Sequence, residues 1–140
     1  MLTRAAVLDE MNLPRPYATS RPLKIMEVEL DPPGEGEVLV RMRAAGLCHS
    51  DLSVINGDRP RPLPMALGHE GAGEVLEVGD GVTGLSPGDH VVSAFVPCCG
   101  ACRPCQEGRP ALCEPGLTAN TAGHLLSGAR RLHYAGREIH

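Results

Sequence analysis

The chain has 140 residues, of which 42% are apolar and 21% charged, so one small globular domain is expected. A formal net charge of −4 and an aromatic content of 2% disfavour a module that stacks bases or binds a phosphate backbone. No apolar run reaches the roughly 18 residues of a membrane span, and the N-terminus does not resemble a signal peptide. We therefore expect a cytoplasmic protein with neither a membrane nor a nucleic acid as partner.

Short runs of alternating polarity predict strands along much of the chain. The expected strands cover residues 3–9, 23–30, 37–45, 72–78, 90–95 and 129–132. In the run 23–30, Leu23, Ile25 and Val28 alternate with charged residues. A slip in this alternation near Met26 indicates a bulge.

The run 37–45 has the clearest strand pattern. Val38, Val40 and Met42 are predicted to share one of its faces. The later run His90–Phe95 is mostly apolar, and it is predicted to form a buried strand.

Proline and glycine separate these runs. Residues 48–56 are expected to form a short helix that ends at Gly57, whereas 10–22 and 60–64 are expected to be loops. Residues 98–116 show no periodicity, so this segment needs something other than an apolar core to hold it. Many short strands between turns predict a mainly β protein, a partly open barrel with short helices.

A compact set of four cysteines lies in that aperiodic segment. The spacing C-x2-C-x2-C-x7-C is formed by Cys99, Cys102, Cys105 and Cys113. Clustered cysteines in a reducing compartment bind metal more often than they form disulfides. Four thiolates suit a tetrahedral structural zinc ion, whose binding would stabilise the segment. Disulfides, free core cysteines and an iron–sulfur cluster are the alternatives, and Cys98 is interpreted as a bystander.

A second set of metal-ligating side chains comprises Cys48 in C-H-S-D and the pair His69 and Glu70. Together they offer a thiolate, an imidazole and a carboxylate, all of which zinc accepts. Glycines around the pair permit a tight backbone or the close approach of another segment or ligand. These are Gly68, Gly71 and Gly73. A polar surface pair beside an ordinary turn or bulge is the alternative.

Several motifs occur together in the order typical of one family. Residues 68–82 match G-H-E-x2-G-x5-G-x2-V, preceded by C-H-S-D at 48–51 and followed by G-D-H-V and the four-cysteine loop. In this order the chain resembles the zinc-containing alcohol dehydrogenases, which are medium-chain dehydrogenases with a GroES-like catalytic domain. The resemblance covers nearly the whole chain and is strongest over residues 37–113. The tail from Gly128 loosely resembles the branch with glutathione-dependent enzymes.

The resemblance implies two zinc sites. Cys48 and His69 would be ligands of a catalytic zinc, with Glu70 as a further ligand or an outer partner. Asp51 would orient His69 through its other ring nitrogen. The structural zinc would be held by Cys99, Cys102, Cys105 and Cys113.

The resemblance also implies hydride transfer between an alcohol and NAD or NADP, with aldehydes or ketones as the products of oxidation. Ser50 would take the alcohol proton, and His49 would face the cofactor pyrophosphate. Many members of the family extend the proton relay with a histidine where this chain has Ser53. We further expect a homo-oligomer.

Some features of the family are absent. No G-x-G-x-x-G follows a predicted strand, so the Rossmann domain is missing, and the second catalytic cysteine is expected beyond residue 140. We interpret residues 1–140 as an incomplete GroES-like catalytic domain with a structural-zinc lobe at about 98–116. The isolated chain is expected to be inactive, with a weakened catalytic zinc site.

The sequence also allows other functions. A non-enzymatic zinc-binding assembly module and a relative of thiol-dependent formaldehyde dehydrogenases remain as alternatives. A polyol dehydrogenase is less favoured, because many of those enzymes have glycine where this chain has His49.

Overall fold

The computed structural model describes residues 1–140 and consists mainly of short strands. The strands are β1 (Leu2–Leu8), β2 (Leu23–Leu30), β3 (Val38–Ala45), β4 (Met65–Ala66), β5 (Gly71–Val78), β6 (His90–Val92), β7 (Leu132–Tyr134) and β8 (Arg137–Ile139). The helices are α1 (Tyr17–Ser20), α2 (His49–Ile55), α3 (Arg103–Gln106) and α4 (Glu114–Ala122), with a 3-10 turn, η1 (Pro110–Leu112). The expectation of a mainly β fold with short helices is confirmed.

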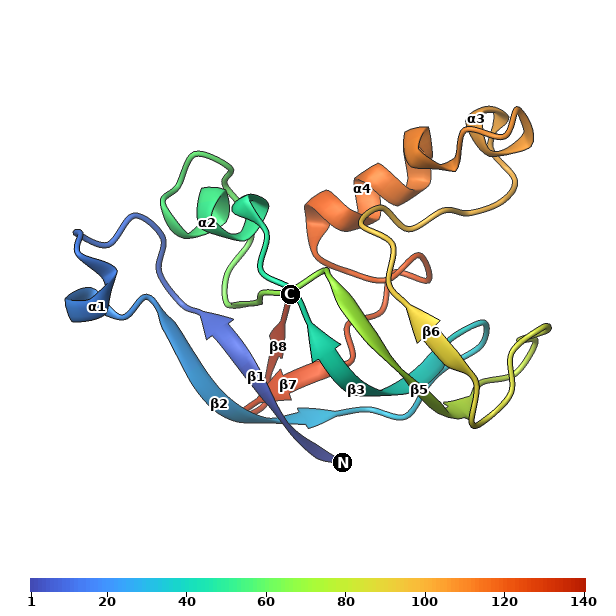
Figure 1. Ribbon diagram of the computed structural model, residues 1–140, viewed down its shortest axis with the longest axis horizontal. Coiled ribbons are helices and arrows are strands. Elements are labelled where there is room, and N and C mark those ends of the chain that lie inside the picture. The colour runs from blue at the N-terminus through green and yellow to red at the C-terminus, as the bar shows by residue number, and fades with distance from the viewer.

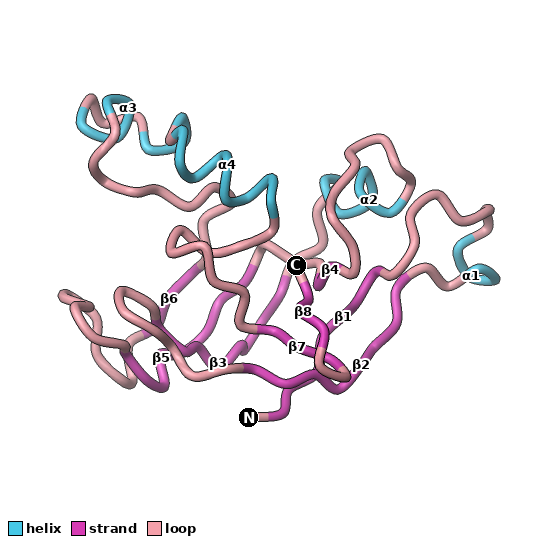
Figure 2. The backbone as a smooth tube through the Cα atoms, turned by 180° about the vertical axis from the view of Figure 1, so that it is seen from behind, coloured by secondary structure: helices cyan, strands magenta, loops and turns pink.

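Two antiparallel sheets form the body of the chain. One has the strand order β4-β1-β2-β7-β8 and the other β3-β5-β6. Figure 1 and the reverse view in Figure 2 show the sheets side by side, with α2 and α4 on the same side of them and α3 at the outer end of an arm. No parallel pair is present, so this chain contains no doubly wound Rossmann sheet. None of its helices combines the length and the apolar character needed to cross a membrane.

A small apolar cluster fixes α2 on the first sheet. Leu8 of β1 is fully buried against Val54 and Ile55 of α2. The short helix expected at 48–56 is thus present, and its last two residues are buried. This packing attaches the C-terminal end of α2 to β1, and Cys48 lies at the other end of the same short helix.

The prediction for the faces of β2 is wrong. The β1–β2 register is continuous from Leu2–Glu29 to Leu8–Leu23, so no bulge interrupts it near Met26. Strict alternation then places Met26 on the same face as buried Val28, and Ile25 on the other face, where it is 70% exposed.

The second sheet also departs from the predicted pattern. Register shifts in the β3–β5 pair lie at Leu39/Val40 and at Met42/Ala44, and Met42 is exposed. The expected strand His90–Phe95 is limited to His90–Val92 and is an exposed edge strand, not a buried one. The alternation of polar and apolar residues predicted the positions of these strands in the sequence. The burial of their side chains is decided by the bulges in the β3–β5 pair and by the edge position of β6.

The C-terminal segment forms elements that the sequence did not reveal. A strand was expected at 129–132, whereas β7 and β8 form a hairpin that begins at Leu132. Ala135 and Gly136 both have positive φ, as a two-residue hairpin turn of type I′ requires. The unexpected helices are α1, within the predicted loop 10–22, α3, within the aperiodic segment 98–116, and α4.

Glu37 joins the two sheets through a charged network. Its carboxylate accepts hydrogen bonds from the Arg131 guanidinium at 2.8 and 3.3 Å, from the Ser127 hydroxyl at 2.9 Å and from the Gly34 N–H at 2.9 Å. Because Glu37 precedes β3 and Arg131 precedes β7, the pair connects strands of different sheets. The hydrogen bonds from Arg131, helped by those from Gly34 and Ser127, outweigh burial and lower the pKa of Glu37.

Glu37→Gln should make the free energy of unfolding less dependent on pH in the acidic range. A lowered pKa in the folded state stabilises the fold above the ordinary pKa of glutamate, and this contribution is lost as pH falls through the lowered pKa. The variant should therefore lose about 1 kcal/mol at neutral pH and less at about pH 3. Urea unfolding at both pH values measures the difference. Exposed Glu35→Gln is the control, and an equal effect of both variants would contradict the assignment.

Candidate functional site

The four predicted cysteines come together in the arm. Their sulfur atoms lie within 4.8 Å of one another, and none of the six cysteines is in a disulfide. Cys102 Sγ lies 3.5 Å from Cys105 Sγ and 3.8 Å from Cys113 Sγ. Cys98 is exposed and lies outside the cluster. The disulfide alternative therefore has no support in the structure.

Local backbone geometry points the thiols inward. Cys102 precedes α3 and Cys113 precedes α4, so each lies at the start of a helix. The N–H groups of Cys99 and Gly116 donate to Cys113 Sγ at 3.2 and 3.3 Å, and Cys102 N–H donates to Cys99 Sγ at 3.3 Å. These N–H groups stabilise negative charge on sulfur, which is the form that binds a metal ion.

The cysteines of this cluster do not ionise equally. Backbone N–H groups of Ala101 and Cys102 lower the pKa of Cys99 to about 6, whereas burial raises the pKa of Cys105 to about 12. Four thiolates at this separation repel one another, so a cation is needed to hold all four in the ionised state. A set of four sulfur donors fits zinc in a closed, tetrahedral structural site.

The second predicted set of ligands is also brought together. Donor atoms of Cys48, His69 and Glu70 lie within 4.8 Å of one another, although 20 residues separate Cys48 from the His-Glu pair. Cys48 directly precedes α2, and His69 and Glu70 directly precede β5. One thiolate, one imidazole and one carboxylate fit zinc, with a position left for water or another ligand.

Asp51 holds two of these ligands at once. Its Oδ1 lies 3.2 Å from His69 Nδ1, and its Oδ2 accepts a hydrogen bond from Cys48 N–H at 3.2 Å. The other ring nitrogen of His69 is thereby left as the donor atom toward the metal position. Burial opposes ionisation of His69, but its contacts with Cys48 and Asp51 raise its pKa overall.

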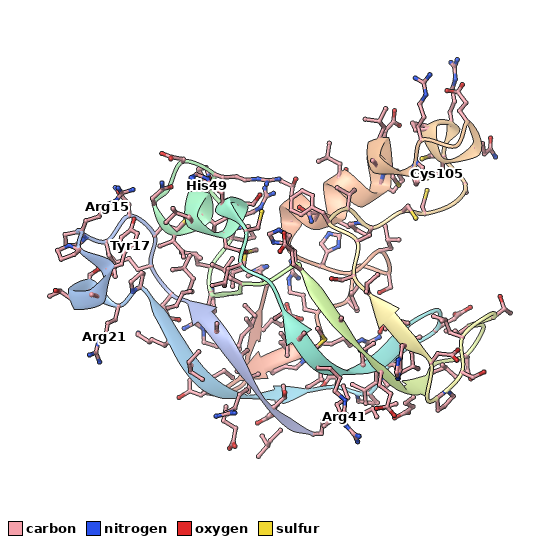
Figure 3. The ribbon with its side chains drawn as sticks, in the orientation of Figure 1. Arg15, Tyr17, Arg21, Arg41, His49 and Cys105 are labelled. Carbon is pink, nitrogen blue, oxygen red and sulfur yellow. The ribbon has the colours of Figure 1, made fainter.

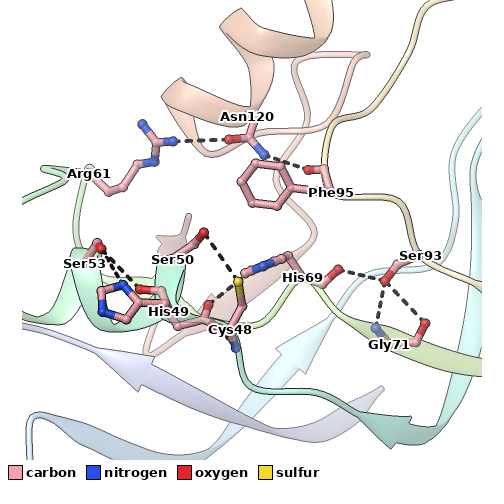
Figure 4. A network of polar contacts seen from close by, with 11 residues as sticks. Cys48, His49, Ser50, Ser53, Arg61, His69, Gly71, Ser93, Phe95 and Asn120 are labelled. Carbon is pink, nitrogen blue, oxygen red and sulfur yellow. Dashed lines mark hydrogen bonds and ion pairs between the residues drawn. The ribbon is translucent and has the colours of Figure 1, made fainter. Parts of the chain in front are cut away.

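Ser50 and His49 differ in their surroundings. Ser50 Oγ lies 3.5 Å from Cys48 Sγ, and hydrogen bonding from Ser50, followed by that from His69, lowers the pKa of Cys48. His49 is exposed, and its Nδ1 lies 3.5 Å from Ser53 Oγ on the same helix (Figures 3 and 4). Ser50 thus faces the metal-ligating set, while His49 faces solvent.

Two residues that the sequence did not single out position the His-Glu pair. Ser93 Oγ donates to His69 O at 2.8 Å and accepts from Gly71 N–H at 2.8 Å (Figure 4). Gly46 N–H donates to Glu70 O at 2.9 Å, and a Cβ at Gly46 would collide with the Glu70 carboxylate. Ser93 and Gly46 lie outside the recognised motifs, so the spacing of residues in the sequence gave no signal for either of them.

The glycines of the G-H-E motif do more than turn the chain. A side chain at Gly73 would meet the Arg41 carbonyl at 2.5 Å, so its absence lets β3 and β5 approach closely. Gly68, just before His69, has a φ of 132°, a conformation that other residues rarely adopt. The close-approach interpretation therefore fits Gly73, and the turn interpretation fits Gly68.

A family comparison matches this arrangement. The model of the alcohol dehydrogenase GroES-like domain matches residues 34–135. The chain belongs to this family. The family resemblance and the GroES-like fold expected from the motifs are thus confirmed.

Individual relatives carry the names of alcohol dehydrogenases or of a related dehydrogenase. The chain is 47% identical over 138 residues to an NDMA-dependent alcohol dehydrogenase of Amycolatopsis methanolica, covering 99% of this chain and 35% of the relative. It is 39% identical to the S-(hydroxymethyl)glutathione dehydrogenase of Escherichia coli, covering 100% of this chain and 36% of the relative. A crystal structure of an alcohol dehydrogenase zinc-binding domain protein from Burkholderia ambifaria matches with a TM-score of 0.88 and 38% identity, covering 100% of this chain and 36% of that one.

The alcohol dehydrogenase GroES-like fold of this chain places a cleft beside the second set of ligands. The cleft is lined by Ser50, Asp51 and His69 together with Phe95, whose ring centroid lies 4.7 Å from that of His69 in an edge-to-face contact. The chain spans about a third of the length of the relatives described above.

Proposed function

We propose that this chain is the zinc-binding catalytic part of an alcohol dehydrogenase that interconverts alcohols with aldehydes or ketones and uses NAD or NADP. The observation that carries the proposal is the convergence of Cys48, His69 and Glu70 beside a cleft that also contains Ser50. The family match and the names of the relatives support the same activity. Residues 1–140 would then be one incomplete catalytic domain, with the structural-zinc lobe at about 98–116.

The residues of the cleft have separate tasks in this proposal. Cys48, His69 and Glu70 would hold the catalytic zinc, and Asp51 fixes the first two in place. Zinc bound there supplies a Lewis acid that lowers the pKa of an alcohol hydroxyl. Ser50 lines the same cleft, and in this proposal its hydroxyl would accept the proton of the alcohol.

The remaining parts of the proposal concern surroundings and partners. Cys99, Cys102, Cys105 and Cys113 would hold the structural zinc. A cytoplasmic location is part of the proposal, since a reducing compartment keeps these thiolates from oxidation. His49 as a contact of the cofactor pyrophosphate and a homo-oligomeric assembly stay predictions.

A second candidate substrate is a hydroxymethyl adduct of a thiol. It is favoured by the 39% identity to the S-(hydroxymethyl)glutathione dehydrogenase of Escherichia coli. The ligand set and the role of Ser50 would be the same for this substrate, because it too presents a hydroxyl group on the carbon that is oxidised.

The test combines metal content with turnover. At saturating zinc the chain should bind two zinc ions, and Cys48→Ser should bind one. Alcohol-dependent reduction of NAD or NADP by the longest protein product that contains this sequence should fall at least about 100-fold in Ser50→Ala. The 140-residue chain alone should not reduce either cofactor.

Cys98→Ser is the matched control, because Cys98 is exposed and lies outside both ligand sets. It should leave metal content and turnover unchanged. Binding of a single zinc ion by the unaltered chain, together with no turnover in the longest product, would favour the non-enzymatic zinc module instead.

A further inference from the structure

The cleft beside His69 contains two positive charges from one loop. Arg59 and Arg61 both line it and are both partly buried, and they lie in the loop between α2 and β4. Neither guanidinium is in an ion pair with a carboxylate of this chain. Partly buried and unpaired charges are costly, so they point to a ligand that neutralises them.

Contacts hold both side chains toward the cleft. The Arg59 guanidinium lies 5.5 Å from the centroid of the Phe95 ring, which in turn contacts His69 edge-to-face at 4.7 Å. One aromatic ring therefore separates the Arg59 charge from a proposed metal ligand. Arg61 donates one hydrogen bond to Asn120 Oδ1 at 3.2 Å, and Asn120 donates to Phe95 O at 3.3 Å (Figure 4).

Hydrogen-bond capacity remains at both guanidinium groups. A guanidinium has five N–H donors, and the side chain of Arg61 uses one of them. Asp51 also lines the cleft, but its two oxygens are engaged by His69 and Cys48. Burial and the nearby charge of Arg59 both lower the pKa of Arg61. The two positive charges are therefore close enough to repel each other.

We propose that Arg59 and Arg61 select an alcohol or aldehyde that carries a carboxylate, or an anion of similar geometry, at the end remote from its reacting carbon. This inference rests on the proposed function, since the same cleft would hold the reacting hydroxyl beside Ser50 and His69. Guanidinium groups bind carboxylates with paired, charge-assisted hydrogen bonds, and this end of the cleft offers two of them. Phe95 lies between the two ends and provides an apolar surface for the carbon chain.

The experiment compares matched ligands on the zinc-loaded chain by calorimetry. The Kd of 6-hydroxyhexanoate should be about tenfold lower than that of hexanol, as a charge-assisted hydrogen bond predicts. Arg59→Gln and Arg61→Gln should each remove most of this difference while hexanol affinity is kept. Arg4→Gln is the control, because Arg4 is exposed on β1 and has no ion pair; it should keep the difference.

A charge reversal guards against simple misfolding of the neutral variants. The double variant Arg59→Glu with Arg61→Glu should reverse the preference and favour 6-aminohexanol over 6-hydroxyhexanoate. Equal affinities of hexanol and 6-hydroxyhexanoate for the unaltered chain would overturn the selection by charge and leave the proposed function intact. Binding of neither ligand would overturn both. If inorganic diphosphate bound more tightly than 6-hydroxyhexanoate and displaced it, the arginines would be assigned to a cofactor phosphate and the proposal would fall.

Discussion

Cys102→Ser should release the structural zinc and unfold the arm while both sheets stay folded. Cys102 Sγ lies 3.5 Å from Cys105 Sγ and 3.8 Å from Cys113 Sγ. Its loss therefore removes one of the four sulfur donors from a closely spaced set. Within residues 98–116 the buried residues are Cys113, itself a proposed ligand, and Gly116. No apolar cluster there can replace the metal as the source of folding free energy.

The expected loss of zinc affinity exceeds the roughly 10–100-fold that follows removal of an outer hydrogen-bond partner, because here a ligand itself is lost. Metal analysis after dialysis should find one zinc ion fewer per chain. Amide hydrogen exchange should be fast from Cys99 to Cys113 and remain slow at Val7 and Val28, which are buried in the first sheet.

The adjacent Cys98→Ser provides a matched control for this result. Cys98 is next to the first ligand in sequence, but its side chain is exposed and lies outside the cluster. If Cys102→Ser kept its zinc and its slow exchange, or if Cys98→Ser had the same effect, the proposed four-thiolate site would be wrong.

Alternation and motif spacing predicted the strands and the ligands for a physical reason. A period of two fixes which residues can share a face, and it located β1, β2, β3 and β5 within a residue or two. Two-residue gaps between cysteines let successive thiols converge, so the cluster followed from spacing. Cys48 was grouped with His69 and Glu70 by ligand type, and the family resemblance then supported the grouping, because no local rule joins residues that far apart.

Burial was harder to predict than the strands themselves. Ile25 and Met42 are apolar and were predicted to share faces with other apolar residues, yet both are exposed. In each case the strand register decides which side chains are buried. β2 has no bulge where one was expected, and β3 has register shifts that were not expected. The β7–β8 hairpin was missed because its turn has alanine, not asparagine or glycine, at the first positive-φ position.

The cleft could not be derived from sequence patterns. Arg61 and Asn120 are 59 positions apart, and their hydrogen bond depends on how α4 lies relative to the loop before β4. The loop 60–64 is irregular and rich in proline, so no periodicity tells which way Arg59 and Arg61 point. Only the assembled fold brings these side chains to Ser50 and His69.

Asp51→Asn should weaken metal binding at the second site by about 10–100-fold, the usual effect of losing an outer hydrogen-bond partner. The carboxylate accepts at both oxygens, from the Cys48 N–H and at His69 Nδ1. An amide of the same shape has one acceptor oxygen and one donor nitrogen. Whichever way it is turned, one of these two contacts loses its acceptor, so one of the two ligands is no longer held.

The measurement is a zinc competition titration of the chain with its four-thiolate site already filled, so that only the second site reports. Asp58→Asn is the matched control: Asp58 lies on the loop that follows α2, is exposed and contacts Asn56, not a proposed ligand. It should leave the second zinc affinity unchanged. Equal affinities for Asp51→Asn and the unaltered chain would mean that the carboxylate does not orient His69. In that case the Asp51 carboxylate would serve the first turn of α2 alone, through the hydrogen bond that it accepts from Cys48 N–H.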